Sequence, residues 1–203
     1  MSSPPAQRRA LPPLDPEAIW ADVWCRLGEA VGSARHPFHL AVFATLRDGA
    51  PEQRTVVLRG VDPQRHQTTF HTDLRSPKAA DLAKPGPASW LFYDATTRVQ
   101  LRLRGTAELV HRSEEVDRRW QNSRLQSQSC YRHLVGPGSH LDSPLDYLPD
   151  KSDSGAGTRG RQHFAIVVTQ IISLEWLSLH HAGHRRLRFT IGDRGVDSTW
   201  LAP

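Results

Sequence analysis

The sequence predicts a mainly β, α+β domain, in which an antiparallel β-barrel has a few helices packed outside it. Most of the chain from residue 38 onward falls into short segments where apolar and polar residues alternate, the period of a half-buried strand. Helical periodicity is confined to a few stretches, and strands and helices do not alternate as they do around a parallel sheet. At 203 residues, 38% of them hydrophobic, the chain is long enough to bury one substantial core.

The composition excludes several other classes of protein. It is not that of a collagen, a coiled coil or a wholly disordered chain, and no apolar run approaches the roughly 20 residues that span a bilayer. Arg8 and Arg9 are followed by no apolar stretch, so we expect no secretory or twin-arginine signal. Cys25 and Cys130 lie far apart in dissimilar contexts, which argues against a disulfide framework and favours a reducing, cytoplasmic location.

Arginine carries most of the net charge of +5, since only Lys78, Lys84 and Lys151 of the 26 basic residues are lysines. Three interpretations remain open. The cations could attract nucleic acid, a few arginines could hold a small phosphorylated ligand, or the chain could simply reflect a coding preference for arginine. The cations form no compact block, which argues against a nucleic-acid partner.

The first ordered element is a helix. We expect the proline-rich residues 1–13 to be disordered and residues 14–203 to form a single domain. Asp15 can cap the helix and Pro16 suits its first position. Gly32 or the His36-Pro37 step should end it. Its apolar residues follow helical spacing and predict a stripe that faces the core: Ile19, Val23, Trp24, Leu27 and Val31.

The strands begin where the period changes to two. Turn signals at Arg47-Asp48-Gly49 and Asp62-Pro63 separate the early ones. The predicted strands cover residues 38–46, 55–61, 67–72, 88–94, 98–110, 163–179 and 185–191. In the fifth of them Val99, Leu101 and Leu103 fall on one face, and Gln100, Arg102 and Arg104 on the other.

Two further helices and one long loop interrupt the strands. A short helix is predicted over 76–84, with Ser76 as its cap and Pro77 at its first position. Another begins at Ser113 and contains Trp120. Residues 136–162 are rich in glycine, serine, proline and aspartate, and they are predicted to form a long loop.

One glycine motif is misleading. Gly155, Gly157 and Gly160 fit the G-x-G-x-x-G pattern of dinucleotide-binding folds. That fingerprint must follow a strand and open a helix, whereas these glycines lie in a polar loop that leads into a strand. A flexible loop accounts for them better.

The histidines and cysteines do not predict a metal site or a nucleophile. His180, His181 and His184 have a metal-like spacing, but neighbours on a strand point to opposite faces, and no cysteine or carboxylate lies nearby. We therefore expect no metal. Cys25 and Cys130 lack a local histidine partner, so we expect buried or inert thiols.

A dispersed set of residues is compatible with a phosphate group. Arg54 begins the run RTVVLRG and Arg59 closes it, Thr72 ends another predicted strand, and Lys78 lies at the start of the short helix. Two or three cations, a hydroxyl and a helix N-terminus together make a good site for a dianion. Each residue alone would be read as part of a solvated surface.

These segments also carry a resemblance to a known family. The runs RTVVLRG, FHTDLRSPKAADL, ASWLFYD and VQLRLRG resemble the FMN-binding split barrels of the pyridoxamine 5'-phosphate oxidase superfamily. The similarity continues through HRSEEVDRRWQNS, PGS and LEWLSLHHAGHRRLRF, and so covers roughly residues 16 to 203. The PGS and late segments are most similar to a branch known only as oxidase-related FMN-binding proteins.

The resemblance implies a cofactor and a set of contacts. Arg54 and Lys78 would hold the FMN phosphate with help from Thr72. The backbone of residues 55–57 would follow the isoalloxazine ring and ribityl chain, and Gln100 would contact the ring. The family buries FMN at a homodimer interface, so each subunit would supply part of the site. The implied cofactor residues are Arg54, Thr55, Val56, Val57, Arg59, His71, Thr72, Ser76, Lys78, Gln100, Arg102 and Arg186.

Several positions depart from the oxidase pattern. Pro77 replaces a basic residue before the lysine, and Leu177, next to Trp176, stands where the family has a flavin-packing tryptophan. Ala182 or Gly183 precedes His184 in place of an arginine. The substrate-side candidates are Trp120, Arg124 and His184.

These departures imply that FMN binding is retained while recognition of vitamin B6 phosphates is partly dismantled. The resemblance therefore predicts an FMN-dependent oxidoreductase with an unidentified small-molecule substrate and no membrane partner. The alternative is a non-enzymatic flavin- or tetrapyrrole-binding protein on the same barrel.

Overall fold

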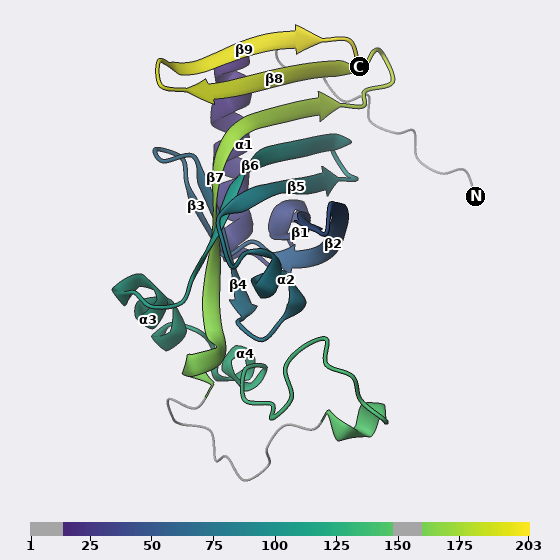
Figure 1. The fold of residues 1–203 in the computed structure, drawn as a ribbon. Coiled ribbons are helices and arrows are strands. Elements are labelled where there is room, and N and C mark those ends of the chain that lie inside the picture. The colour runs from purple at the N-terminus through teal and green to yellow at the C-terminus, as the bar shows by residue number, and fades with distance from the viewer. Residues whose placement is uncertain (1–13, 148–159) are drawn as a thin grey trace, which may run out of the picture.

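The computed structural model describes residues 14–147 and 160–203. The segment expected to be disordered, 1–13, lies outside the described residues, as do 148–159 of the predicted long loop, with Gly155 and Gly157. The strands form one antiparallel sheet in the order β2-β1-β5-β6-β7-β4-β3, which β8 and β9 extend from β7 (Figure 1). The bounds are β1 Leu40–Arg47, β2 Ala50–Val57, β3 Gly60–Asp62, β4 Gln67–Asp73, β5 Gly86–Asp94, β6 Val99–Val110, β7 Phe164–Ser178, β8 Arg185–Gly192 and β9 Gly195–Leu201.

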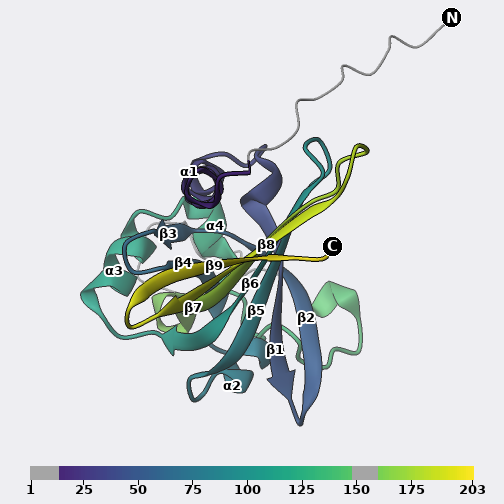
Figure 2. The ribbon, with the colours of Figure 1, turned by 90° about the horizontal axis from the view of Figure 1, so that it is seen from above.

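The helices lie at the sides and at one end of this sheet. Their bounds are α1 Pro16–Gly32, α2 Pro77–Asp81, α3 Glu114–Gln121 and α4 Leu125–Ser129, with short 3₁₀ turns at Pro37–His39, Pro144–Asp146 and Arg161–His163. α1 runs along one side of the sheet from β8 towards β3, and it is seen end-on in Figure 2. None of the described helices is long and apolar enough to cross a bilayer.

The barrel is split because its sheet does not close. β2 ends the sheet on one side and β3 with β4 ends it on the other, and β2 does not pair with β4. β7 is long enough to pair with two strands along one edge. Its first half pairs with β4 and its second half pairs with β8. The predicted antiparallel split barrel is therefore confirmed.

The core lies inside this bent sheet. Phe43, Phe70, Trp90 and Phe92 form a chain of ring contacts, and the Trp90 indole N–H donates to the hydroxyl of Thr169 at 3.0 Å. The stripe of α1 packs against the same core. A second, smaller apolar cluster of Val116, Trp120, Phe164 and Ile166 lies under α3.

The opposite face of the central strands is open in the single chain. The alternation predicted for 98–110 is confirmed, with Leu101 and Leu103 fully buried and Arg102 and Arg104 exposed. On the same face Leu40, Leu91 and Tyr93 remain 54%, 38% and 47% exposed. An exposed apolar patch on a sheet commonly marks a contact surface.

The helix predictions hold at α1 and α3. The Asp15 carboxylate accepts the backbone N–H of Glu17, and the Ser113 hydroxyl accepts that of Val116, so both caps are formed. Ser76 stands at the cap position of α2, but its hydroxyl donates to the carbonyl of Asp73 instead of capping the helix. α2 is also shorter than expected.

Several strand predictions need correction. The predicted strand 55–61 is two strands, because the chain leaves β2 after Val57 and starts β3 at Gly60, while β2 itself begins earlier, at Ala50. Asp48 and Gly49 have φ of 52° and 81°, as the tight turn before it requires. β9 was not predicted. Its residues are almost all exposed and so carry no burial pattern.

The histidine and cysteine predictions were also partly wrong. His180 and His181 lie in the loop after β7, and their rings are 4.2 Å apart and not on opposite faces. Cys25 and Cys130 are free and exposed, so the expectation that they are buried is wrong. That the thiols are inert stays a prediction.

Candidate functional site

A cavity of about 310 Å³ occupies the split of the barrel. One wall is β2, the opposite wall is β4, and Lys78 of α2 closes one side. Four residues of the segment from the end of α3 to just past α4 also line the cavity. The cavity collects six of the residues implied by the resemblance, namely Thr55, Val56, Val57, Arg59, His71 and Lys78, together with Leu40, Ser123, Ser127, Cys130 and Tyr131.

The β2 wall is suited to a flat polar ligand. β2 pairs only with β1, so its other edge has no strand partner. An edge strand presents backbone N–H and C=O groups that a ligand can satisfy. Residues 55–57 lie at this edge and line the cavity.

Two cations line the cavity without a carboxylate partner. Among the residues that the structure describes, no ion pair joins Lys78 or Arg59 to an acidic group. Burial, and then the positive charge of Arg54, lower the pKa of Lys78, while Asp73 and Asp81 oppose that shift. A phosphate beside Lys78 would supply the missing counter-charge.

His71 contributes a neutral imidazole. Burial, followed by the charges of Arg59 and Arg119, lowers its pKa to about 3. Its Nε2 atom is buried and has no hydrogen-bond partner in the described chain. A buried polar atom left unpaired in a cavity indicates a ligand that completes its hydrogen bonding. The unpaired imidazole, the edge backbone and the free cations all fit a flavin nucleotide.

Because the pKa of His71 is lowered, His71 should make the ligand-free protein sensitive to acid. The unfolded chain takes up this proton below about pH 6.5, whereas the folded chain does so only near pH 3. The free energy of unfolding should therefore fall as the pH drops through this window, by up to about 1.4 kcal/mol per pH unit from this group. The free energy of unfolding, measured in urea at several pH values, should depend less steeply on pH in His71→Gln than in wild type. Equal slopes would contradict the assignment.

Arg54 lies next to this cavity, held by other side chains. Its guanidinium donates to the hydroxyl of Thr45 at 2.7 Å and pairs with Asp81 at 3.3 Å. Its charge acts on Lys78. The two cations expected to hold a phosphate are thus neighbours, although Arg54 does not line the cavity.

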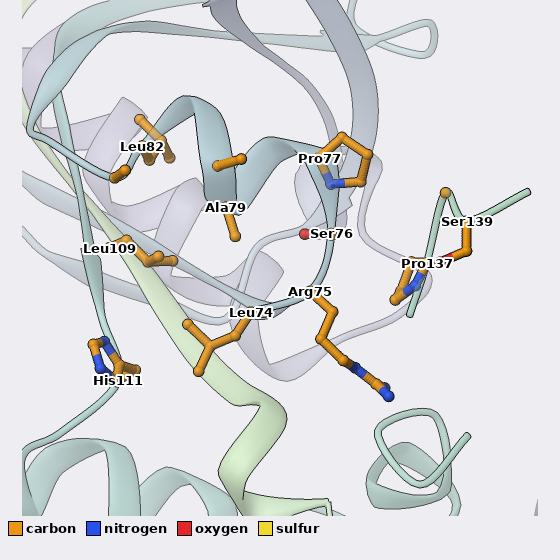
Figure 3. A pocket seen from close by; sticks show the side chains of 13 residues that line it. Leu74, Arg75, Ser76, Pro77, Ala79, Leu82, Leu109, His111, Pro137 and Ser139 are labelled. Atoms are coloured by element: carbon orange, nitrogen blue, oxygen red, sulfur yellow. The ribbon is translucent and has the colours of Figure 1, made fainter. Parts of the chain in front are cut away.

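Thr72 and Ser76 are not directed into the cavity. Both are buried, and their hydroxyl oxygens are 3.3 Å apart. Ser76 instead lines a separate hollow of about 400 Å³ on α2, lined mainly by apolar side chains such as Leu74 and Leu109 (Figure 3). The guanidinium of Arg75 in that wall is already bonded to Asp73 and to the carbonyl of His133. The cavity in the barrel split is therefore the better candidate site.

The remaining implied cofactor residues lie on the open sheet face. Gln100 is separated from the edge strand β2 by β5 and β1, which places it about 14 Å away at three strand spacings. Arg102 and Arg186 both contact the buried carboxylate of Glu175, at 3.4 and 2.6 Å, as does Arg188 at 2.8 Å. The single chain does not bring these residues to the cavity.

The substrate-side candidates are also dispersed. Trp120 is 5% exposed and packs against Tyr131 and Phe164, so it serves the core and has almost no surface for a substrate. Arg124 is exposed at the cap of α4, and His184 is exposed in the loop between β7 and β8.

Sequence reasoning missed the segment around α4. Ser123, Ser127, Cys130 and Tyr131 line the cavity but lie on or beside α4, whose sequence LQSQS shows no helical periodicity. Burial raises the pKa of Tyr131. The aromatic contacts of Tyr131 with Trp120 and Phe164 anchor this segment.

Comparison with solved structures defines the fold. An oxidase-related FMN-binding protein from Nostoc punctiforme PCC 73102 superposes with a TM-score of 0.72 at 20% identity, over 94% of this chain and 100% of that one. PhzG from Burkholderia lata 383, solved with tetrahydrophenazine-1-carboxylic acid, gives a TM-score of 0.70 at 22% identity, over 95% of this chain and 94% of that one. The fold is that of the FMN-binding split barrels.

Comparison of sequences defines the family. The model for the pyridoxamine 5'-phosphate oxidase FMN-binding domain matches residues 20–111. The pyridoxine/pyridoxamine 5'-phosphate oxidase of Deinococcus deserti is 32% identical over 192 residues, which is 91% of this chain and 86% of that enzyme. The enzyme of the same name from Caulobacter vibrioides is 32% identical over 200 residues, 95% of this chain and 88% of that enzyme. The chain belongs to this oxidase family and is an FMN-binding flavoprotein.

Proposed function

We propose that the protein is an FMN-dependent oxidoreductase whose cofactor binds in the barrel split. The observation that carries this proposal is the cavity itself, where an unpaired edge backbone, two cations without carboxylate partners and an unpaired imidazole meet. FMN supplies the redox chemistry when bound, accepting a hydride from a reduced substrate and passing the electrons to oxygen or another acceptor.

The chain's own residues bind and orient the cofactor. Lys78 and Arg54 neutralise the phosphate, and the edge of β2 at residues 55–57 supplies hydrogen bonds along the ring and ribityl chain. The neutral imidazole of His71 offers a hydrogen bond that does not change between pH 5 and 8, since its pKa is about 3. The segment carrying Tyr131 limits the access of water to this side of the cavity.

We also propose a homodimer that completes the site. Gln100, Arg102 and Arg186 share the open face with exposed Leu91 and Tyr93, and none of these residues lines the cavity of its own chain. A second copy packed on this face would cover the apolar side chains and could bring the same residues to the cofactor. Two copies related by a twofold axis present the same patch to each other.

The proposed dimer predicts that a single substitution changes the mass of the particle in solution. Wild-type protein should behave in solution as two chains, and Leu91→Arg should shift it towards one chain, because a guanidinium would be buried without a partner. Leu14→Arg, at an exposed leucine near the start of α1, should leave the mass unchanged. Light scattering after gel filtration measures both. A wild-type mass of one chain would contradict the dimer.

The test of enzymatic function is reduction of the bound flavin. Under anaerobic conditions a true substrate should bleach the blue absorption band of the flavin, and admission of air should restore it. Amines, alcohols and reduced nicotinamides are the donors to try, followed by partly reduced aromatic carboxylic acids of the kind bound to PhzG. Failure of every donor, with full bleaching by dithionite, would support a flavin-binding protein without turnover.

A further inference from the structure

A buried carboxylate on α2 lies between the phosphate-binding candidates and a second arginine. Asp81 is one helical turn after Lys78, and its side chain is 2% exposed. Arg47 donates to it through Nε at 2.7 Å and Nη2 at 3.1 Å. Arg54 contacts it from the other direction, at 3.3 Å from Nη2. No cofactor role for Asp81 follows from the cavity lining, because Asp81 does not reach it.

Thr45 joins the two ends of this network. Its hydroxyl donates to Asp81 at 2.8 Å and accepts from Nη1 of Arg54 at 2.7 Å. Thr45 is 2% exposed and lies on the inner side of β1. Arg54 is thereby fixed at two of its nitrogen atoms, while its remaining N–H groups have no partner in the described chain.

We propose that Asp81 is a positioning residue for the cofactor's phosphate: it holds Arg54 beside Lys78 so that both cations meet the same anion. This inference rests on the proposed function. Arg54 and Lys78 repel each other, and a flexible arginine on an edge strand would otherwise turn away into solvent. The charge of Asp81 and the hydroxyl of Thr45 oppose that repulsion. A preorganised guanidinium loses less freedom when it binds a phosphate.

The groups around Asp81 favour its ionised form. Burial alone would raise the pKa of Asp81, but hydrogen bonds from Arg47 and Thr45 and the charges of Arg47 and Arg54 lower it below its ordinary value. Arg47 therefore stabilises the charged carboxylate of Asp81, and that carboxylate in turn holds the guanidinium of Arg54 in place.

A positioning role for Asp81 and a simple effect of its charge predict opposite changes in FMN affinity when Asp81 is replaced. Asp81→Asn removes a negative charge close to the phosphate site, so by charge alone FMN should bind more tightly. If Asp81 acts by positioning Arg54, FMN should bind about tenfold more weakly, equivalent to about 1.4 kcal/mol. Riboflavin, which lacks the phosphate, should bind equally well to both proteins. The quantity to compare is the ratio of the FMN and riboflavin dissociation constants, measured by titration of the full-length apoprotein.

A matched control is available at Asp94. It is also a buried carboxylate, 4% exposed at its side chain, and it pairs with Arg26 at 2.6 Å away from α2. Asp94→Asn should lower thermal stability as Asp81→Asn does, but it should leave the FMN to riboflavin ratio unchanged. A similar change of ratio in both variants would mean that the effect comes from general loosening of the fold, and it would overturn the proposal.

Two further variants make the outcome decisive. In an Arg54→Gln background, Asp81→Asn should have no additional effect on the ratio, because Asp81 acts through Arg54; an undiminished effect would contradict the proposal. If Asp81→Asn does not fold, Thr45→Val removes only the bridging hydroxyl and should still shift the ratio in the same direction. An unchanged or improved ratio in Thr45→Val would overturn the proposal.

Lys78→Ala distinguishes this inference from the function on which it rests. If Lys78→Ala loses its preference for FMN while Asp81→Asn keeps it, the phosphate site stands and only the role of Asp81 falls. If Lys78→Ala keeps the full preference, the phosphate site itself is wrongly placed.

Discussion

Replacing Lys78 by alanine should weaken FMN binding by about 30-fold to several hundredfold and leave riboflavin binding nearly unchanged. The ammonium is partly buried at the side of the cavity and has no carboxylate partner among the described residues. Losing a desolvated charged contact costs on the order of 2–4 kcal/mol, and each 1.4 kcal/mol is about a factor of ten in affinity. Riboflavin lacks the phosphate and should not register this loss.

The measurement is a titration of apoprotein with each ligand, followed by quenching of flavin fluorescence. Lys84→Ala is a suitable control, because Lys84 is an exposed lysine just after α2. It should change neither affinity beyond about a factor of two. Equal losses for FMN and riboflavin in Lys78→Ala would show that this lysine does not bind the phosphate.

The second large effect concerns substrate. Oxidation of pyridoxine or pyridoxamine 5'-phosphate should be at least about a hundredfold weaker than expected for an oxidase with both phosphate-binding arginines, since a missing charged contact costs about 3 kcal/mol in the transition state. Arg124 is present but exposed, and Ala182 and Gly183 stand where the resemblance to the oxidases implies a late arginine. His184 is a poor replacement, because an imidazole cannot make the bidentate contact that a guanidinium makes with a phosphate.

Steady-state assays of the FMN-loaded protein with both phosphates, following aldehyde formation, test this prediction. The prediction would be wrong if Arg185 replaced the late arginine. A shift of the β7–β8 loop by one residue would place the Arg185 guanidinium at that position. Efficient turnover that is abolished by Arg124→Ala would restore the assignment as a vitamin B6 phosphate oxidase.

The fold could be predicted from the sequence where burial leaves a pattern. β5, β6 and the first half of β7 bury alternate or continuous residues, and each was expected close to its observed bounds. The first half of β2 and nearly all of β9 are exposed, so their sequences show no alternation of buried and exposed residues. They become strands because β2 pairs with β1 and β9 pairs with β8. Such pairing cannot be predicted from the local sequence.

The site could be predicted only in part, for a related reason. The motifs around Arg54, His71 and Lys78 lie near one another along the chain, and folding brings their segments to the barrel split. Gln100 and Arg186 belong to the same implied list, yet the single chain holds them on another part of the sheet. The order of motifs along the sequence indicates which residues share a function. It does not indicate whether those residues come from one chain or from two. The partners Asp81 and Glu175 could not be predicted because they are acidic residues without a motif.

The central claim is that the split of the barrel holds one FMN per chain. Its most direct test is the visible spectrum of protein purified without added cofactor, together with identification of the released flavin and its ratio to protein. We expect flavin absorption bands and the release of FMN and not riboflavin. When FMN is supplied, the ratio of flavin to protein should approach one per chain in wild type, but not in Lys78→Ala at the same concentration. A Soret band, or a wild-type protein that stays colourless in excess FMN, would contradict it.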